Sequence, residues 1–226
     1  MEFKNYIMSQ LIFKFPFKKR YFEQDFFVSS NNFSAYKLVE SWPNWPGKWL
    51  NMYGASGSGK THLSKILEKK IESIIVLDEN KINDIAISEL NKKECLIIDN
   101  FKNKIDERLF YSFLNHSKQL NNYILINSFK PLSKFNFNLM DLKSRIDSFI
   151  NIGIDLPPDD LLHVIITKTF SEKQITISPK ISDYIVKNVE RSYDKMFKFL
   201  KDVDDLSLSS GRSININLIK KVLKNE

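Results

Sequence analysis

Short apolar runs alternate with stretches of helical periodicity through the first two thirds of the sequence. Runs of four to six residues predict buried strands at residues 49–53, 74–77, 95–98, 123–126 and 149–154. Between them, residues 60–71 and 106–119 repeat apolar side chains on one helical face. Strands that alternate with helices are typical of a parallel sheet with crossover helices. The pattern therefore predicts an α/β fold: a parallel five-stranded sheet with strand one central and helices on both faces.

The pattern changes after the fifth predicted strand. Two prolines and two acids at residues 157–160 are typical of a hinge followed by the first turn of a helix. Only helical patterns follow, over residues 159–172, from Pro179 after a capping Ser178, over about 193–206 and over 217–224. We expect an N-terminal tail at residues 1–20, an α/β base at 21–155 and a small helical lid at 156–226.

A glycine-rich loop follows the first predicted strand. The stretch GASGSGKT, residues 54–61, matches the phosphate-loop pattern G-x-x-x-x-G-K-[ST] in full and opens a predicted helix. Gly57 and Gly59 let the backbone turn its N–H groups inward around a phosphate, and the helix start adds its positive dipole end. Lys60 can neutralise the outer phosphates, and the Thr61 hydroxyl can ligate Mg²⁺. The candidate nucleotide-binding residues are Gly57, Ser58, Gly59, Lys60, Thr61 and His62.

The third predicted strand ends in a carboxylate. In CLIIDN, residues 95–100, apolar residues lead directly into Asp99, which can hold Mg²⁺ through water. An ordinary acid at the exit of a strand is the alternative. Asn100 follows, and an amide cannot take a proton from an attacking water at neutral pH, so it cannot act as a general base. We therefore expect slow intrinsic ATP hydrolysis.

Length and composition fit one main domain with a small satellite. The chain has 226 residues, of which 42% are hydrophobic and 27% charged, as in ordinary globular proteins. No apolar run reaches the roughly 18 residues that a membrane span requires, and the start lacks the pattern of a signal peptide. The single Cys95 lies in an apolar strand, as a core residue of a protein in the reducing cytoplasm would. We expect a cytoplasmic location.

The net charge of +7 raises the question of nucleic-acid binding. It arises from 34 basic and 27 acidic residues, and most of the lysines are scattered singly or in pairs. Diffuse charge of this kind gives weak, unspecific attraction to phosphate backbones. Direct, specific DNA binding by this chain is therefore not expected.

Several segments together resemble one family. They are SQLIFKFPF, EQDFFVSSNNFSAY, SWPNWPGKWLNMYGASGSGKTHL, LIIDN, DLKSRID and VERSYDKMFKFL. They resemble the Hda family, the DnaA-related regulators of replication initiation, and most closely the HdaA-type proteins of alphaproteobacteria. The resemblance runs from about Ser9 to the C-terminus. It implies an AAA+ base with a helical lid, without the DNA-binding helix-turn-helix domain of the initiator.

The resemblance also implies roles for Arg145, Asn127 and Val28. Arg145 in DLKSRID matches the arginine that AAA+ proteins present to a neighbour's nucleotide, a role that suits a permanent planar charge. A surface salt bridge with Asp141 or Asp147 is the alternative. Asn127 matches the first sensor, a polar group that contacts the γ-phosphate, with a loop-capping amide as its alternative. Val28 is expected to border the adenine.

The lid departs from the family pattern at the second sensor. The initiators carry an arginine early in the third lid helix, where this sequence has Asp194. An acid repels phosphates, so the lid is expected to hold a γ-phosphate poorly. Arg191, one turn earlier, is a weaker candidate for the missing cation.

The N-terminal tail carries a further motif. Gln10, Leu11, Ile12 and Phe13 resemble the short Q-L-x-hydrophobic peptides that bind a pocket of the DNA sliding clamp, the beta subunit of the polymerase. Such a peptide binds in an extended form, with its apolar side chains filling the pocket. An edge strand that turns alternate phenylalanines onto the base is the alternative. The candidate partner-binding residues are Gln10, Leu11 and Phe13.

Three functions remain open on this basis. The first is a regulator with bound ADP or ATP and Mg²⁺ that docks on the clamp and stimulates ATP hydrolysis by the DnaA initiator through Arg145. The second is a DNA-acting AAA+ ATPase, either a truncated initiator or a helicase loader, which Asn100 and Asp194 argue against. The third is a small kinase, which the few arginines in residues 159–226 argue against. Self-association is left open.

Overall fold

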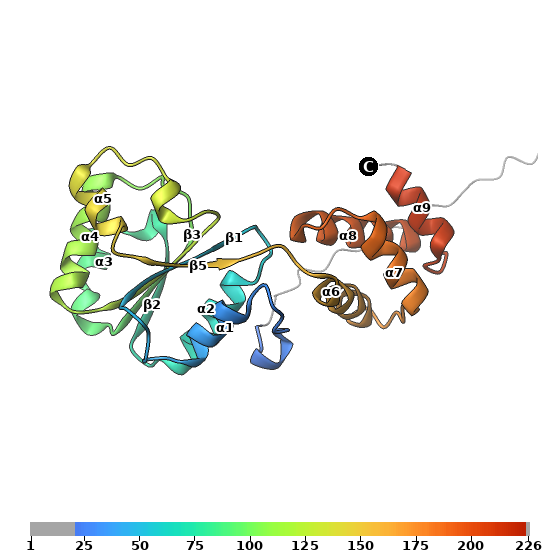
Figure 1. Cartoon of the computed structure of the whole chain (residues 1–226), viewed down its shortest axis with the longest axis horizontal. Helices are drawn as coiled ribbons and strands as arrows, with labels where there is room; N and C mark the ends of the chain where they lie inside the picture. The colour runs from blue at the N-terminus through green and yellow to red at the C-terminus, as the bar shows by residue number, and fades with distance from the viewer. Residues whose placement is uncertain (1–20, 225–226) are drawn as a thin grey trace, which may run out of the picture. The chain divides into compact units, whose positions relative to one another are not determined.

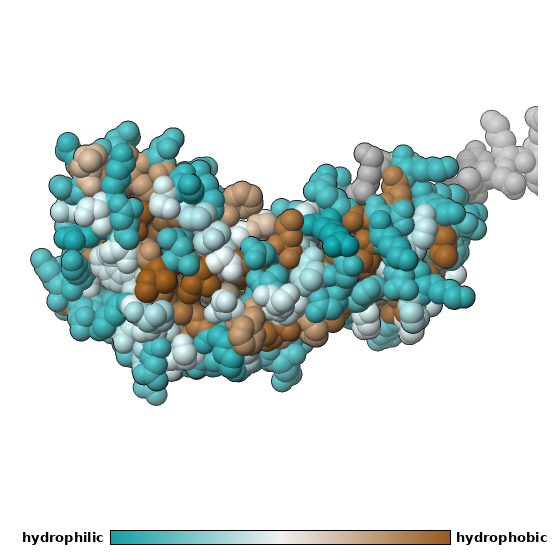
Figure 2. Space-filling model, in the orientation of Figure 1, coloured by the Kyte–Doolittle hydropathy of each residue, from teal (hydrophilic) through white to brown (hydrophobic). Residues whose placement is uncertain are grey.

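The computed structural model describes residues 21–224 of the chain. These residues form two compact units, an N-terminal base at residues 21–156 and a C-terminal lid that begins at Pro157. Hydrophilic side chains cover most of the face of each unit that is visible in Figure 2. No helix within the described residues is both long enough and apolar enough to cross a membrane.

The base is built on a parallel sheet of five strands (Figure 1). The strands are β1 (Trp49–Gly54), β2 (Ile74–Asp78), β3 (Cys95–Phe101), β4 (Tyr123–Ser128) and β5 (Ile150–Ile154). Their order is β2-β3-β4-β1-β5, and every neighbouring pair is parallel. The predicted five-stranded parallel sheet is confirmed, but its central strand is β4. The prediction of strand one at the centre is wrong. Strands β2 and β3 lie on one side of β4 and strands β1 and β5 on the other, so β1 is next to the centre.

Helices cover both faces of this sheet (Figure 1). They are α1 (Phe33–Glu40), α2 (Lys60–Lys70), α3 (Asp84–Ser88), α4 (Glu107–Gln119) and α5 (Met140–Ile146). Four short 3₁₀ helices join them, at Glu23–Asp25, Glu79–Lys81, Leu90–Lys92 and Leu132–Lys134. Side chains of α1 and α2 share one apolar core with one face of the sheet, and those of α4 and α5 share a second core with the other face.

Alternation along the strands produces these two cores. Leu96 and Ile98 of β3 pack into the core under α4, while Cys95 and Ile97 pack into the core under α2. Because helices cover both faces of the sheet, the inner strands are apolar almost without interruption. These apolar runs are the pattern from which the strands were predicted. The outer strands β2 and β5 are only partly buried.

The lid consists of four helices around its own core. They are α6 (Asp159–Ser171), α7 (Pro179–Asn188), α8 (Tyr193–Ser210) and α9 (Ile216–Lys224). Phe170, Met196 and Phe199 are among the fully buried residues of this core. Pro179 stands at the first position of α7, as predicted, but Ser178 makes no capping hydrogen bond with its side chain. Helix α8 extends four residues past its predicted end and stops where Gly211 takes a positive φ of 61°.

Candidate nucleotide-binding site

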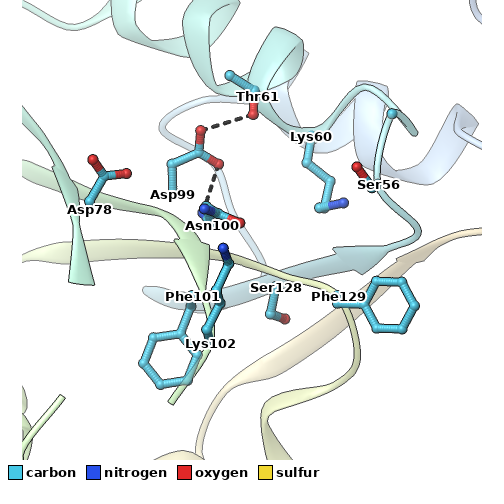
Figure 3. A pocket seen from close by; sticks show the side chains of 11 residues that line it. Ser56, Lys60, Thr61, Asp78, Asp99, Asn100, Phe101, Lys102, Ser128 and Phe129 are labelled. Atoms are coloured by element: carbon cyan, nitrogen blue, oxygen red, sulfur yellow. Dashed lines mark hydrogen bonds between the residues drawn. The ribbon is translucent and has the colours of Figure 1, made fainter. Parts of the chain in front are cut away.

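A cavity of about 650 Å³ opens beside the loop between β1 and α2 (Figure 3). This volume is within the range of small-molecule sites. It is lined by Ser56, Gly57, Lys60, Thr61, Asp78, Asp99, Asn100, Phe101, Lys102, Ser128 and Phe129. These residues come from the phosphate loop and from the carboxyl ends of β2, β3 and β4. The carboxyl edge of a parallel sheet is where α/β proteins commonly bind ligands.

The phosphate loop has the backbone that the sequence pattern predicted. Gly57 and Gly59 have φ angles of 79° and 98°, a region that residues with a side chain avoid. Lys60 turns back over the loop, and its ammonium donates hydrogen bonds to the carbonyl oxygens of Gly54 and Ala55 at 2.7 and 2.8 Å. The lysine is therefore already held over the loop, where incoming phosphate oxygens can replace the carbonyl oxygens as acceptors.

Thr61 and Asp99, 38 residues apart in sequence, meet at the cavity. The Thr61 hydroxyl donates to Asp99 Oδ2 at 2.9 Å, while Asp99 Oδ1 accepts from the backbone N–H of Asn100 at 3.0 Å. Hydroxyl and carboxylate oxygens are the ligands that Mg²⁺ prefers. The residues present therefore fit a magnesium ion, with the Thr61 oxygen and the Asp99 carboxylate as the groups that would hold it.

Asn127 contacts Asp99 instead of the open cavity. Its side chain is fully buried, and its amide nitrogen donates to Asp99 Oδ1 at 2.9 Å and to Ser64 Oγ at 2.7 Å. Its carbonyl oxygen has no hydrogen-bond partner within the described residues. The neighbouring Ser128 lines the cavity in its place. In this arrangement Asn127 orients the carboxylate, and a direct contact with a γ-phosphate stays a prediction.

Asn100 occupies an unusual backbone position. Its φ is +57°, and the register between β3 and β4 shifts at this point, so Asn100 is exposed at the cavity while Phe101 returns to the core. Asparagine tolerates this left-handed conformation better than most residues. The amide is therefore at the cavity, where a general base would act, and it cannot perform that role.

Other predicted site residues lie away from the cavity lining. His62 Nε2 is 2.7 Å from the carbonyl oxygen of Phe22, and Ser58 is buried beneath Lys60, which donates to its hydroxyl at 3.3 Å. Val28 is half-buried and is not among the lining residues. Gln10, Leu11 and Phe13 lie outside the described residues.

Two charged residues of the cavity lining, Asp78 and Lys102, were not predicted from the sequence. Asp78 ends β2 and pairs in register with Asp99, so two carboxylates stand side by side at the edge of the sheet. Its position directly after a predicted strand was an available signal, because parallel strands end at the same edge. Lys102 follows β3, and no sequence pattern pointed to it.

Arg145 lies on α5 and does not line its own cavity. The half-buried side chain donates from Nε to Asn115 Oδ1 of α4 at 2.7 Å. Neither Asp141 nor Asp147 forms an ion pair with it, so the salt bridge considered as an alternative is not present. Within the described part of the chain, the contact with Asn115 leaves both terminal amino groups of the guanidinium available for other acceptors.

Near the start of α8 the lid carries Asp194 and Arg191, the two residues considered for the second sensor. Asp194 is exposed in the first turn, where an acid is favourable beside the positive end of the helix dipole. Arg191 forms an exposed ion pair with Asp159, at 3.0 Å between Nη2 and Oδ1. Arg191, the weaker candidate for the missing cation, is therefore occupied within the lid itself.

Comparison with known proteins places these features in a family. A family model described as the Hda lid domain matches residues 159–223. The chromosomal replication initiator protein DnaA of Borreliella afzelii is 28% identical over 94% of this chain and 49% of its own length. The chain is thus similar to the Hda family over its lid and to the DnaA initiators over most of its length. It spans about half the length of the curated relatives it matches.

Solved structures show the same fold. Domain III of the Thermotoga maritima replication initiation protein DnaA aligns with a TM-score of 0.72 at 18% identity, covering 93% of this chain and 98% of that one. AMPPCP-bound DnaA from Aquifex aeolicus aligns with a TM-score of 0.67 at 19% identity, covering 84% and 67%. The prediction of an AAA+ sheet followed by a helical lid is thereby confirmed.

Proposed function

We propose that this AAA+ protein is a nucleotide-bound regulator of chromosomal replication initiation. It docks on the DNA sliding clamp and stimulates ATP hydrolysis by the DnaA initiator. The relatives that support a role in initiation are themselves initiators. The observation that carries the regulatory role is Arg145, a permanent cation that is held in place without serving the cavity of its own chain.

The nucleotide is ADP or ATP with Mg²⁺. Lys60 and the backbone N–H groups of the loop bind the phosphates, while Thr61 and Asp99 hold the metal ion, which neutralises phosphate charge. The AMPPCP-bound structure of a protein with this fold supports a nucleotide in the cavity. Asn127 keeps the Asp99 carboxylate oriented by donating to one of its oxygens.

Arg145 acts on the nucleotide of a neighbouring initiator. Because Asn115 binds only Nε, the two terminal amino groups can reach the phosphates of a partner and stabilise the charge that develops during hydrolysis. Asn100 places an amide directly after Asp99, where a second acid would serve as general base, so the bound nucleotide serves mainly to hold the structure that presents Arg145.

Docking on the clamp rests on the sequence of the tail. Gln10, Leu11 and Phe13 supply the amide and the apolar side chains that a clamp pocket binds. Tethering to a clamp on DNA raises the effective concentration of Arg145 near a DNA-bound initiator. A DNA-acting ATPase is the alternative function, and it requires substantial turnover by the isolated chain.

Reconstitution with clamp-loaded DNA and ATP-bound initiator tests the proposal. Arg145→Ala should abolish the stimulated release of phosphate while leaving nucleotide binding and clamp binding unchanged. In GTPases an arginine supplied by a partner is worth about 10³ to 10⁵ in rate, and we expect the lower end of that range or less. The double variant Gln10→Ala, Leu11→Ala should lose clamp binding and stimulation together.

Arg108→Ala is the matched control, because Arg108 is an exposed arginine at the start of α4, the helix that carries Asn115. It should stimulate as well as the parent. Full stimulation by Arg145→Ala would contradict the proposed mechanism.

A further inference from the structure

Lys102 is the second lysine that lines the cavity, after Lys60 of the phosphate loop. It directly follows β3, and in Figure 3 Asp99 and Asn100 lie between Thr61 and the ammonium group of Lys102. The residue is exposed, and its ammonium makes no hydrogen bond or ion pair with any other described residue. A free cation therefore faces the part of the cavity beyond the Thr61–Asp99 pair.

A buried carboxylate fixes the backbone that carries Lys102. Glu79, which is only 7% exposed, accepts the backbone N–H of Lys102 at 2.9 Å and that of Lys104 at 3.3 Å. Asn103, between them, donates from its side chain to the carbonyl oxygen of Asn136 at 3.0 Å. Charge-assisted bonds of this kind are among the stronger hydrogen bonds in proteins. The start of the Lys102 side chain is therefore held in place before any ligand binds.

Lys102 determines the net charge of the cavity lining. Lys60 and Lys102 balance Asp78 and Asp99, the two carboxylates of the lining. Without Lys102 the lining would be net negative, facing a ligand that stays negative even with a bound Mg²⁺. At short range, in a cavity that excludes part of the solvent, such a charge matters more than it would on an open surface.

We propose that Lys102 contacts the terminal phosphate of a nucleoside triphosphate and sets the preference of the site between triphosphate and diphosphate. This inference rests on the nucleotide site proposed above. The phosphate loop and Lys60 bind the phosphates near the start of α2, so the end of a longer phosphate chain extends toward β3 and Lys102. A lysine serves here as a point charge on a flexible stem, and its fixed backbone limits where that charge can go.

Nucleotide titration of the full chain tests this inference. Affinities for Mg²⁺-AMPPCP and Mg²⁺-ADP should be measured by calorimetry for the parent and for Lys102→Met, which keeps an unbranched side chain one atom shorter and removes its charge. We expect Lys102→Met to weaken AMPPCP binding about tenfold or more and ADP binding less than about twofold. Lys102→Arg should restore the parent's ratio of the two affinities.

Lys104→Met is the matched control. Lys104 belongs to the same Glu79-bound segment but does not line the cavity, so its removal should leave both affinities unchanged. Equal losses for both nucleotides in Lys102→Met, or no loss at all, would overturn the inference. If the parent binds both nucleotides and Lys60→Ala abolishes both, the proposed nucleotide site stands whatever Lys102 does. If the parent binds neither nucleotide, the site and the inference are both wrong.

Discussion

The carboxylate of Asp99 accepts hydrogen bonds from three parts of the base. Thr61 donates from α2, Asn127 from β4, and the backbone of Asn100 from β3 itself. An ionised carboxylate can only accept, so the Asn127 amide must turn its nitrogen toward Asp99. This leaves the Asn127 carbonyl oxygen buried without a partner among residues 21–224. The unpaired oxygen lowers the stability of the fold, and the same side-chain orientation keeps Asp99 directed at the cavity.

Only part of this arrangement was accessible from the sequence. Thr61 and Asp99 are predictable because a phosphate loop and a strand end carry local signatures. The contact between Asn127 and Asp99 depends on side-chain directions that only the assembled sheet determines. The same holds for Lys102, whose position depends on Glu79, a residue 23 positions earlier with no local signature.

Cys95 gives a prediction about reactivity and pH at the scale of a single residue. The thiol is fully buried, and burial raises its pKa from 9.0 to about 12. The unfolded thiol ionises near pH 9 while the folded thiol stays protonated. Its contribution to the free energy of unfolding is therefore complete below pH 9 and is lost as the pH rises toward 12.

We expect a thiol reagent such as DTNB to label Cys95 slowly in the native protein at pH 8 and rapidly in denaturant. Cys95→Ala should lose less stability between pH 9 and pH 11 than the parent does. Complete labelling of the native protein within seconds would show that Cys95 is not in the core.

Asn51 links two elements that position the cavity. This fully buried residue of β1 donates to the carbonyl oxygen of Ile126 at 2.9 Å and to Ser128 Oγ at 2.8 Å. Its own carbonyl oxygen accepts the backbone N–H of Leu132 at 3.0 Å. The three bonds fix the chain where it leaves β4 and so hold Ser128 and Phe129 at the cavity.

Asn51→Ala should lower the free energy of unfolding of the base by about 2 to 3 kcal/mol, because it leaves buried backbone groups unpaired. Urea unfolding followed by tryptophan fluorescence reports on the base alone, since Trp42, Trp45 and Trp49 are the only tryptophans of the chain. The control is Asn151→Ala, at the exposed position on β5 that pairs with Asn51. It should change the free energy of unfolding by less than about 0.5 kcal/mol. Equal effects of the two variants would refute the structural role of Asn51.

The length of a helix or strand determined whether it could be predicted from the sequence. The buried strands and the longer helices carry enough periodic residues to be recognised, and their predicted bounds lie within a few residues of those observed. Helix α3, with five residues, and the 3₁₀ helices, with three each, are too short to show a period. The central position of β4 depends on which strands pair, and that information lies in contacts between distant parts of the chain.

At the scale of the whole molecule, slow ATP hydrolysis is predicted from one residue in each unit. The base has an amide, Asn100, at the cavity, and the family resemblance predicts that Asp194 of the lid stands where the initiators carry an arginine. Each unit has its own core, so neither defect reflects an incomplete fold. On the proposed function, the protein binds a nucleotide and hydrolyses it slowly, which is the division expected of a regulator that acts on a partner's nucleotide.

The isolated chain should therefore hydrolyse ATP far more slowly than about 1 s⁻¹. Asn100→Asp tests the cause, because aspartate tolerates the left-handed backbone at φ +57° and adds the missing carboxylate. We expect it to raise the rate of phosphate release about tenfold or more, within the range of a positioned general base. Asn121→Asp is its control, since Asn121 is exposed, has a similar φ of 60° and does not line the cavity, and its rate should equal the parent's. Turnover by the parent at about 1 s⁻¹ or faster would instead favour an ATPase that acts through its own hydrolysis.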